Sequence, residues 1–164
     1  MNIQQRIDKV IAILKNETVQ YTQPIVTQFS YDKDPFKVLI SCLLSLRTKD
    51  TTTGPASERL FQLADTPEKM IKLDVKKIEK AIYPVGFYKT KAQRIKEICN
   101  VLIQQYNSKV PDEIDELLKF KGVGRKTANL VVTLGYGKLG ICVDTHVHRI
   151  SNRLGLVKTK NPHE

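Results

Sequence analysis

The segment spanning residues 117–129 combines residue types that could act on a phosphate-containing substrate. It reads Leu-Leu-Lys-Phe-Lys-Gly-Val-Gly-Arg-Lys-Thr-Ala-Asn. Gly122 and Gly124 allow the backbone to approach a ligand closely, and amides at such a turn and at the start of the next helix would form an anion site. The segment also fits an ordinary turn between antiparallel helices. The anion-site interpretation is favoured by the surrounding cations, which are Lys119, Lys121, Arg125 and Lys126.

Lys126 is the candidate nucleophile of this segment. Cations in the first turn of a helix oppose its dipole by about 0.3–1 kcal/mol each when exposed, so the adjacent Arg125 and Lys126 would be compensated by a bound phosphate. The same positive field favours the neutral amine that a Schiff-base nucleophile requires. The alternative interpretation of Lys126 is a solvated surface lysine.

Asp144 is the second candidate, because it ends the apolar run 141–143 and precedes a predicted helix. A carboxylate at this place is either the cap of that helix or a partly buried catalytic group. His146 and His148 are two residues apart and therefore diverge on a helix. We expect no metal site.

Composition favours a nucleic-acid partner. The chain has 164 residues, with 27 Lys and Arg against 17 Asp and Glu, and a net charge of +10. Such a basic excess favours a polyanion, either nucleic acid or an anionic membrane surface. Three separated cysteines, in apolar runs, fit neither a disulfide framework nor a metal-binding spacing. With no signal stretch and no long apolar run, we expect an intracellular, cytoplasmic protein associated with the nucleoid, without a membrane span.

Helical periodicity dominates the chain and predicts an all-α fold of eight or more short helices. Proline after Asp34 and after Thr66 marks helix starts, and Asp74 marks another. An amphipathic helix is expected over 89–106, a short helix from Pro111, a helix from about 125 to 134 and a last one from about Thr145. The only candidate for β structure is the short run 140–143.

These two segments, at this separation, resemble the endonuclease III family of DNA glycosylases, which joins a helix-hairpin-helix to a Gly/Pro-rich loop and a catalytic aspartate. The match comprises Gly-Val-Gly-Arg-Lys-Thr-Ala-Asn at 122–129, Val-Asp-Thr-His at 143–146, then Arg149 and Asn152-Arg153. Upstream it includes Leu43-Leu44-Ser45 with Thr48-Lys49-Asp50, and Val85-Gly86-Phe87-Tyr88 with Lys91-Ala92. The resemblance therefore covers nearly the whole chain.

The resemblance implies a bifunctional enzyme that removes oxidised pyrimidines and cleaves the strand by β-elimination. Lys126 matches the family's nucleophile and Asp144 its activating carboxylate. The target base must leave the helical stack, since C1′ is inaccessible inside a duplex, and Arg47 and Phe87 match the positions that wedge into the gap. Phe87 could equally be a core aromatic residue. The expected partner is duplex DNA with a damaged base or abasic site, bound by a monomer through Lys119, Lys121, Gly122, Val123, Gly124, Arg125, Thr127 and His146.

The implied domains are an N-terminal helix at 1–22, a helical barrel at 23–138 with the helix-hairpin-helix at 112–135, and a catalytic-aspartate segment at 139–164. Three features depart from the family pattern: Lys121 replaces a proline, Arg47 replaces a glutamine, and the C-terminal cysteines that hold a [4Fe–4S] cluster are absent. We therefore expect no cofactor in this chain, and a cluster only if a longer C-terminus carries four cysteines. The last departure predicts an exposed face on the N-terminal helix.

Two alternatives remain open from the sequence. Helix-hairpin-helix units also occur in proteins that only grip the DNA backbone, and an inactive truncated paralogue could retain both Lys126 and Asp144. Binding alone does not require that pair of residues. The pair therefore distinguishes the enzyme from a non-catalytic binding module.

Overall fold

The computed structural model describes residues 2–31 and 33–164, apart from the side chain of Ser30. This part of the chain is all-helical and contains no strand, so the predicted fold class is confirmed and the candidate β run at 140–143 is not a strand. It forms two compact units, one of residues 24–141 and one that joins residues up to Gln23 to residues from Cys142 onward. None of its helices is long and apolar enough to cross a membrane.

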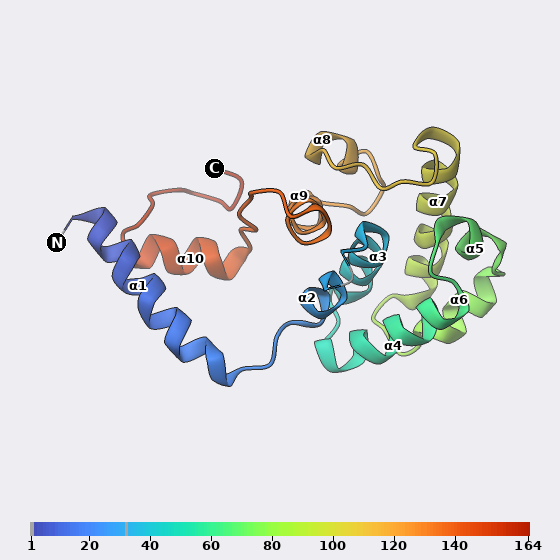
Figure 1. Cartoon of the computed structure of the whole chain (residues 1–164), viewed down its shortest axis with the longest axis horizontal. Coiled ribbons are helices and arrows are strands. Elements are labelled where there is room, and N and C mark those ends of the chain that lie inside the picture. Colours follow the sequence, from blue (N-terminus) through green and yellow to red (C-terminus); the bar gives the residue numbers. More distant parts are fainter. Residues whose placement is uncertain (1, 32) are drawn as a thin grey trace. The chain divides into compact units, whose positions relative to one another are not determined.

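The larger unit is built around α3, Pro35–Ser45, which lies at its centre (Figure 1). Asp34 begins this helix, and its side chain accepts hydrogen bonds from the amides of Phe36 and Lys37, as an N-cap residue should. Eight of the eleven residues are buried, which explains the apolar run in the sequence. Helices α2 (Ile25–Ser30), α4 (Asp50–Leu63), α7 (Tyr88–Gln105) and α9 (Arg125–Leu130) pack against α3.

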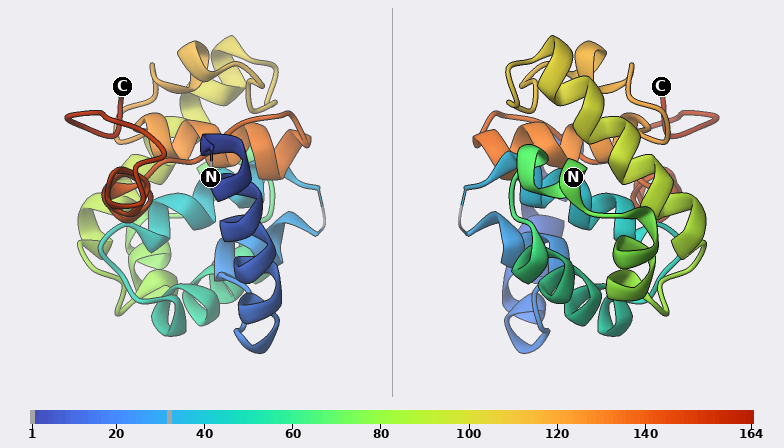
Figure 2. Two further views of the ribbon diagram at one scale, coloured as in Figure 1. Left: turned by 90° about the vertical axis from the view of Figure 1, so that its left-hand side faces the viewer. Right: turned by 90° about the vertical axis from the view of Figure 1, so that its right-hand side faces the viewer.

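Helix α7 runs beside α5 (Pro67–Lys72) and α6 (Val75–Ile82) in the same unit (Figure 2). The expected N-caps Thr66 and Asp74 precede α5 and α6. The expected apolar stripe of α7 is buried, with Ala92, Ile95, Ile98, Cys99 and Leu102 facing the core. Spacing of apolar residues therefore predicted this helix and its orientation correctly.

The unit ends with α8 (Ile114–Leu117), α9 and the π-helical turn η2 (Val131–Gly135). The helix predicted to start at Pro111 starts three residues later, at Ile114. Glu113 still has extended backbone and is the N-cap residue of α8. The helix expected over 125–134 is present, but its last turn widens to the π form. Thr133 Oγ donates to the carbonyl of Asn129 at 2.7 Å within this turn.

Helices α2 and α4 were not expected. Helix α4 begins Asp-Thr-Thr-Thr-Gly-Pro, a composition that disfavours helix, and it carries Pro55 in its interior. Its apolar face compensates, since Gly54, Ala56 and Leu60 are buried. Tertiary packing therefore overrides local propensity here.

The smaller unit contains α1 (Ile3–Glu17), the short 3-10 turn η1 (Thr18–Gln20) and α10 (Thr145–Arg153). Neither α1 nor α10 contains a buried residue. Arg6 Nη1 joins them by donating to the carbonyl of Leu154 at 3.1 Å. The apolar residues of α1 that remain about half exposed are Ile3, Ile11, Ile13 and Leu14.

Candidate functional site

The hairpin connects α8 to α9 through the turn that contains the two glycines. Gly122 has φ +90°, a left-handed conformation that favours glycine. Val123 is buried, and its amide donates to the carbonyl of Phe120 at 3.0 Å. The expectation that the amide of Val123 faces a ligand is therefore wrong, because the turn uses this group internally. The amide of Ala128 donates to the carbonyl of Gly124 at 2.9 Å, and Gly124 is the N-cap residue of α9.

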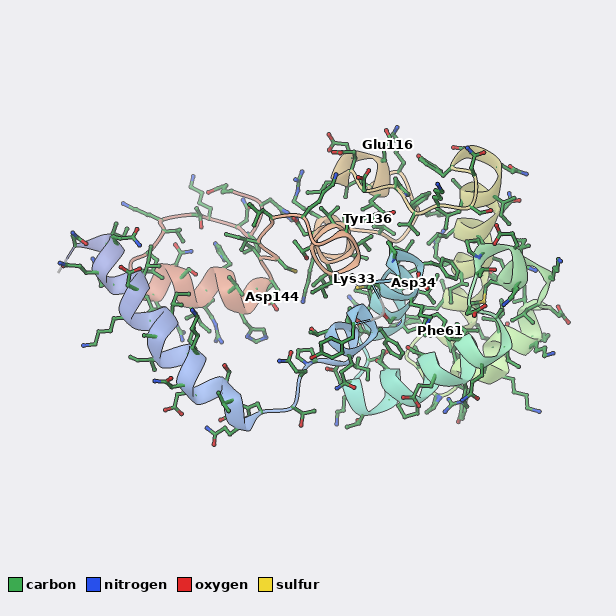
Figure 3. The ribbon with its side chains drawn as sticks, in the orientation of Figure 1. Lys33, Asp34, Phe61, Glu116, Tyr136 and Asp144 are labelled. Atoms are coloured by element: carbon green, nitrogen blue, oxygen red, sulfur yellow. The ribbon has the colours of Figure 1, made fainter. Side chains whose placement is uncertain are left out.

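The cations of the hairpin are not equivalent. Lys121, Arg125 and Lys126 are exposed. Lys119 Nζ, in contrast, lies 2.5 Å from Oε1 of Glu116. Figure 3 shows Glu116 on α8. This hydrogen bond raises the pKa of Lys119 and lowers the pKa of Glu116. The positive field expected around the turn is therefore weaker on the α8 side than the sequence suggested.

Arg94 lies beside the hairpin, and the sequence did not point to it. An added Cβ on Gly122 would lie 3.4 Å from both Cδ and Nε of Arg94. Arg94 Nη1 also pairs with Glu97 at 2.6 Å. The Arg94 side chain therefore lies at about van der Waals distance from position 122, where the positive φ is the main reason for glycine.

A cavity of about 380 Å³ adjoins Lys126 within the larger unit. Its wall brings Lys126 and Thr127 of α9 together with Arg47, which follows α3. Thr127 is buried, and its side chain lines this cavity, which leaves its backbone amide as the group that could contact DNA. The other lining residues are Pro24, Val26, Thr27, Cys42, Ser45, Leu46, Asp50, Leu130 and Leu134.

Asp50 contributes a carboxylate to this cavity. Its Oδ2 atom accepts a hydrogen bond from the amide of Ile25 at 3.2 Å, which joins the start of α4 to the start of α2. Asp50 was indicated only as a member of the matching family motif. The cavity therefore combines a primary amine, a guanidinium and a carboxylate with an apolar lining.

Asp144 belongs to the smaller unit and is the N-cap of α10 (Figure 3). Its Oδ1 atom accepts hydrogen bonds from the amides of His146 at 3.0 Å and Val147 at 2.8 Å. The capping interpretation is therefore confirmed, and these bonds orient the carboxylate. His146 is exposed, with Nδ1 3.4 Å from Arg149 Nη2, while His148 Nε2 lies 3.2 Å from the carbonyl of Thr159.

Arg47 and Phe87 come together, although forty residues separate them. The Arg47 guanidinium carbon lies 5.9 Å from the centroid of the Phe87 ring, a cation–π arrangement. Phe87 is 64% exposed, so it is not a core aromatic residue. Both residues have positive φ, 53° and 58°, at a strain of about 1–3 kcal/mol each. Such strain persists only where surrounding contacts enforce it.

The cysteines do not fit an iron–sulfur cluster. A [4Fe–4S] cluster takes four thiolates, whereas Cys42 and Cys99 are separately buried in the larger unit and Cys142 belongs to the smaller one. Burial raises the pKa of Cys99 to about 12, which disfavours its thiolate. Among the described residues no group of three potential ligands gathers around a metal position.

Comparison with known proteins identifies the fold. Endonuclease III of Thermotoga maritima is 50% identical over 133 residues, covering 81% of this chain and 62% of that protein. Endonuclease III of Escherichia coli is 39% identical over 127 residues, covering 77% and 60%. The chain thus spans less than two thirds of the length of these curated relatives.

Solved structures agree with the sequence relatives. A non-covalent endonuclease III–DNA complex superposes with a TM-score of 0.81 at 36% identity, covering 96% of this chain and 71% of that one. A trapped endonuclease III–DNA covalent intermediate superposes with a TM-score of 0.78 at 34% identity. The model of the HhH-GPD superfamily base excision DNA repair proteins matches residues 40–164. Because this match covers more than half of the chain, the protein belongs to the HhH-GPD superfamily of base excision DNA repair proteins.

Proposed function

We propose that this chain excises damaged bases from duplex DNA and then cleaves the strand at the resulting site. The observation that carries the proposal is the position of Lys126, exposed at the start of α9 and on the wall of a cavity, directly after the glycine hairpin. A DNA-binding module requires the hairpin and its cations. It does not require a primary amine beside a cavity.

In the proposed reaction, Lys126 Nζ attacks C1′ of the extruded nucleotide, and the bond between C1′ and the base breaks as the base leaves with its electron pair. Opening of the sugar ring gives a Schiff base between Nζ and C1′. Loss of a C2′ proton then breaks the bond from C3′ to its phosphate oxygen, which nicks the strand. The neutral amine needed for attack follows transfer of its proton to a base, a role we assign to Asp144.

We assign DNA backbone binding to the hairpin. The amides at the start of α9 would take a phosphate, and Lys121 and Arg125 would supply charge beside it. Lys119 has a smaller role in this assignment, because Glu116 already partly neutralises it. His146 is exposed at the start of α10 and is assigned a DNA contact by the family resemblance.

We assign Arg47 and Phe87 to the gap left by the extruded base. Phe87 is an exposed aromatic side chain that can stack on neighbouring bases, and Arg47 can hydrogen-bond the unpaired opposite base. Extrusion costs a few kcal/mol and is least unfavourable at damaged or mispaired bases. An exposed aromatic and cationic pair therefore supports selection for damage.

The proposed substrate class is oxidised pyrimidine, with the protein acting as a monomer on cellular DNA. Ser45, Asp50 and Arg47 offer hydrogen-bonding groups on the wall of the cavity, and its remaining lining is mostly apolar. This mixture suits a non-planar pyrimidine with added hydroxyl groups. We also propose that these residues hold no iron–sulfur cluster by themselves, because their cysteines do not form a ligand set, and that a cluster would require four cysteines on a longer C-terminus.

A strand-scission assay tests the proposal. A labelled duplex with one thymine glycol is incubated with the protein, and products are separated with and without later alkali. Wild type should nick the duplex without alkali, Lys126→Gln should not, and Lys119→Gln is a matched control on the same hairpin. Tight binding of the damaged duplex by wild type without nicking or base release would instead support a non-catalytic binding module.

A further inference from the structure

Lys91 connects the end of α3 to the loop that carries Arg47. Its Nζ donates to the carbonyl of Leu44 at 2.8 Å, to the carbonyl of Leu46 at 2.6 Å and to Thr48 Oγ at 3.3 Å. Carbonyls in the last turn of a helix have no intrahelical donor, so the Lys91 ammonium takes the place of a helix cap. Lys91 lies on α7, and the bonds therefore fix the α3–α4 loop against the first turn of α7.

The hydroxyl of Thr48 connects the same loop to a second one, residues 83–87, between α6 and α7. Thr48 Oγ accepts from the amide of Gly86 at 3.2 Å and from Lys91, and it donates to the carbonyl of Leu46 at 3.3 Å. A hydroxyl has one donor and two acceptor positions, and all three are used. Thr48 thus joins both loops and Lys91 at a single atom.

These contacts surround the two strained residues. Arg47 lies between Leu46 and Thr48, whose carbonyl and hydroxyl are both bonded to Lys91. Phe87 follows Gly86, whose amide is bonded to Thr48 and whose added Cβ would lie 2.9 Å from the Arg47 carbonyl oxygen. Movement of one loop relative to the other would therefore break the hydrogen bond between the Gly86 amide and Thr48 Oγ.

We propose that Lys91 and Thr48 are positioning residues that fix Arg47 and Phe87 in the orientation needed to fill the gap during base extrusion. This inference rests on the proposed function, since it assigns a purpose to the wedge pair. Lys91 and Thr48 do not contact DNA in this scheme. They act through the backbone of the two loops.

Lys96 provides a matched control within α7. Its Nζ also donates to two carbonyls that follow a helix, those of Ile71 and Leu73 at the end of α5. These bonds have the same chemistry as those of Lys91 but hold a loop that carries neither Arg47 nor Phe87. Loss of Lys96 therefore reports the effect of removing a half-buried lysine that donates to carbonyls at a helix end, without any effect on Arg47 or Phe87.

The experiment compares two rates for wild type, Lys91→Met, Thr48→Val, Thr48→Ser and Lys96→Met. One rate is base release from a duplex with thymine glycol, which requires extrusion. The other is borohydride trapping on a single-stranded abasic oligonucleotide, which has no stacked partner strand to displace. The ratio of the first rate to the second should fall about 100-fold in Lys91→Met and Thr48→Val. A shift of a positioned group by about 1 Å lowers a rate by about this factor. It should remain within about threefold of wild type in Thr48→Ser, which keeps the hydroxyl, and in Lys96→Met.

A second measurement does not depend on catalysis. A duplex with 2-aminopurine opposite a tetrahydrofuran abasic analogue should gain fluorescence when wild type or Lys96→Met inserts the wedge, and should not when Thr48→Val binds. An equal fall of both rates in the Lys91 and Thr48 variants, or a fluorescence gain equal to wild type in Thr48→Val, would overturn the inference. Wild type that is inactive on both substrates but gives the Thr48-dependent fluorescence would contradict the proposed function and leave the positioning role standing.

Discussion

The glycine hairpin and the paired loops at 46–48 and 83–87 belong to the same compact unit but are stabilised by opposite means. The hairpin reaches a positive φ with glycine, at Gly122, and holds its turn with a backbone bond and the buried side chain of Val123. The paired loops reach positive φ with Arg47 and Phe87, and side-chain hydrogen bonds from Lys91 and Thr48 enforce it.

The two regions are stabilised differently because they expose different groups. A hairpin that offers backbone amides and diffuse charge needs no particular side chain at its tip, so glycine serves it. The wedge loops must present an arginine and a phenylalanine in one relative orientation, and glycine cannot supply either side chain. The strained residues Arg47 and Phe87 therefore lie in the loops, and hydrogen bonds of their neighbours Lys91 and Thr48 hold them in place.

The largest effect is expected from Gly86→Ala. The new Cβ would lie 2.9 Å from the Arg47 carbonyl oxygen, a backbone atom that cannot withdraw without moving the loop. We expect the free energy of unfolding to fall by about 2–3 kcal/mol, measured by urea denaturation. Gly124→Ala is the control, since nothing lies within 4 Å of its added Cβ. Equal stability of the two variants would show that the loops are not tightly coupled.

The next effect is expected from Gly122→Ala. Alanine at φ +90° is strained by about 1–2 kcal/mol, and Arg94 would have to shift by a few tenths of an ångström. We expect lower stability together with about tenfold weaker binding of duplex DNA, measured by fluorescence anisotropy. Gly124→Ala is the control for stability alone, since nothing lies within 4 Å of its added Cβ. A hairpin that contributes nothing to binding would leave the affinity of Gly122→Ala unchanged.

Charge substitutions should separate the cations of the hairpin. Lys121→Gln and Arg125→Gln should each lower the slope of log affinity against log salt by about 0.9, as expected when one phosphate contact is lost. Lys119→Gln should lower it by clearly less, because Glu116 already pairs with Lys119 at 2.5 Å. Binding titrations at several salt concentrations measure the three slopes. Equal slopes for all three variants would contradict the inequality seen in the structure.

The smallest effect is a pH dependence of stability, because the Lys91 side chain is only half buried and solvent screens its charge. Burial lowers the pKa of Lys91 from its ordinary value of 10.5 to about 8. Between these values the unfolded chain binds more protons than the folded chain, so the contribution of Lys91 to stability rises as pH increases from about 8 to 10.5. It is lost again as pH falls through 8. Urea denaturation across this range should show the rise in wild type but not in Lys91→Met, and parallel curves would refute it.

Sequence reasoning predicted the elements that carry strong local signals. The Asp34 cap, the Thr66 and Asp74 starts and the buried stripe of α7 are all present. Helix α4 was missed because its first turns are poor in helix formers and contain Pro55, while the packing that stabilises it is non-local. Boundaries such as the start of α8 also depend on contacts that single residues do not reveal.

The candidate site, like the fold, was only partly predicted, because some of its contacts join residues that are distant in the sequence. Family motifs indicated Lys126, Asp144 and the wedge positions, but the sequence does not show that Glu116 pairs with Lys119 or that Val123 and Thr127 are buried. Lys91 appeared only as a member of a matching motif. Its bonds to Leu44, Leu46 and Thr48 join residues more than forty positions away, and no spacing rule reports such contacts.

The proposed activity depends above all on a covalent bond between Lys126 and the sugar of a damaged nucleotide. The protein is incubated with an abasic-site duplex and borohydride, and the adduct is digested with nuclease and trypsin for mass spectrometry. Trypsin cuts after Arg125 and Lys138 but not after a modified lysine, so we expect peptide 126–138 to carry one reduced sugar remnant. The same modification on a peptide without Lys126, or tight duplex binding with no adduct, would contradict it.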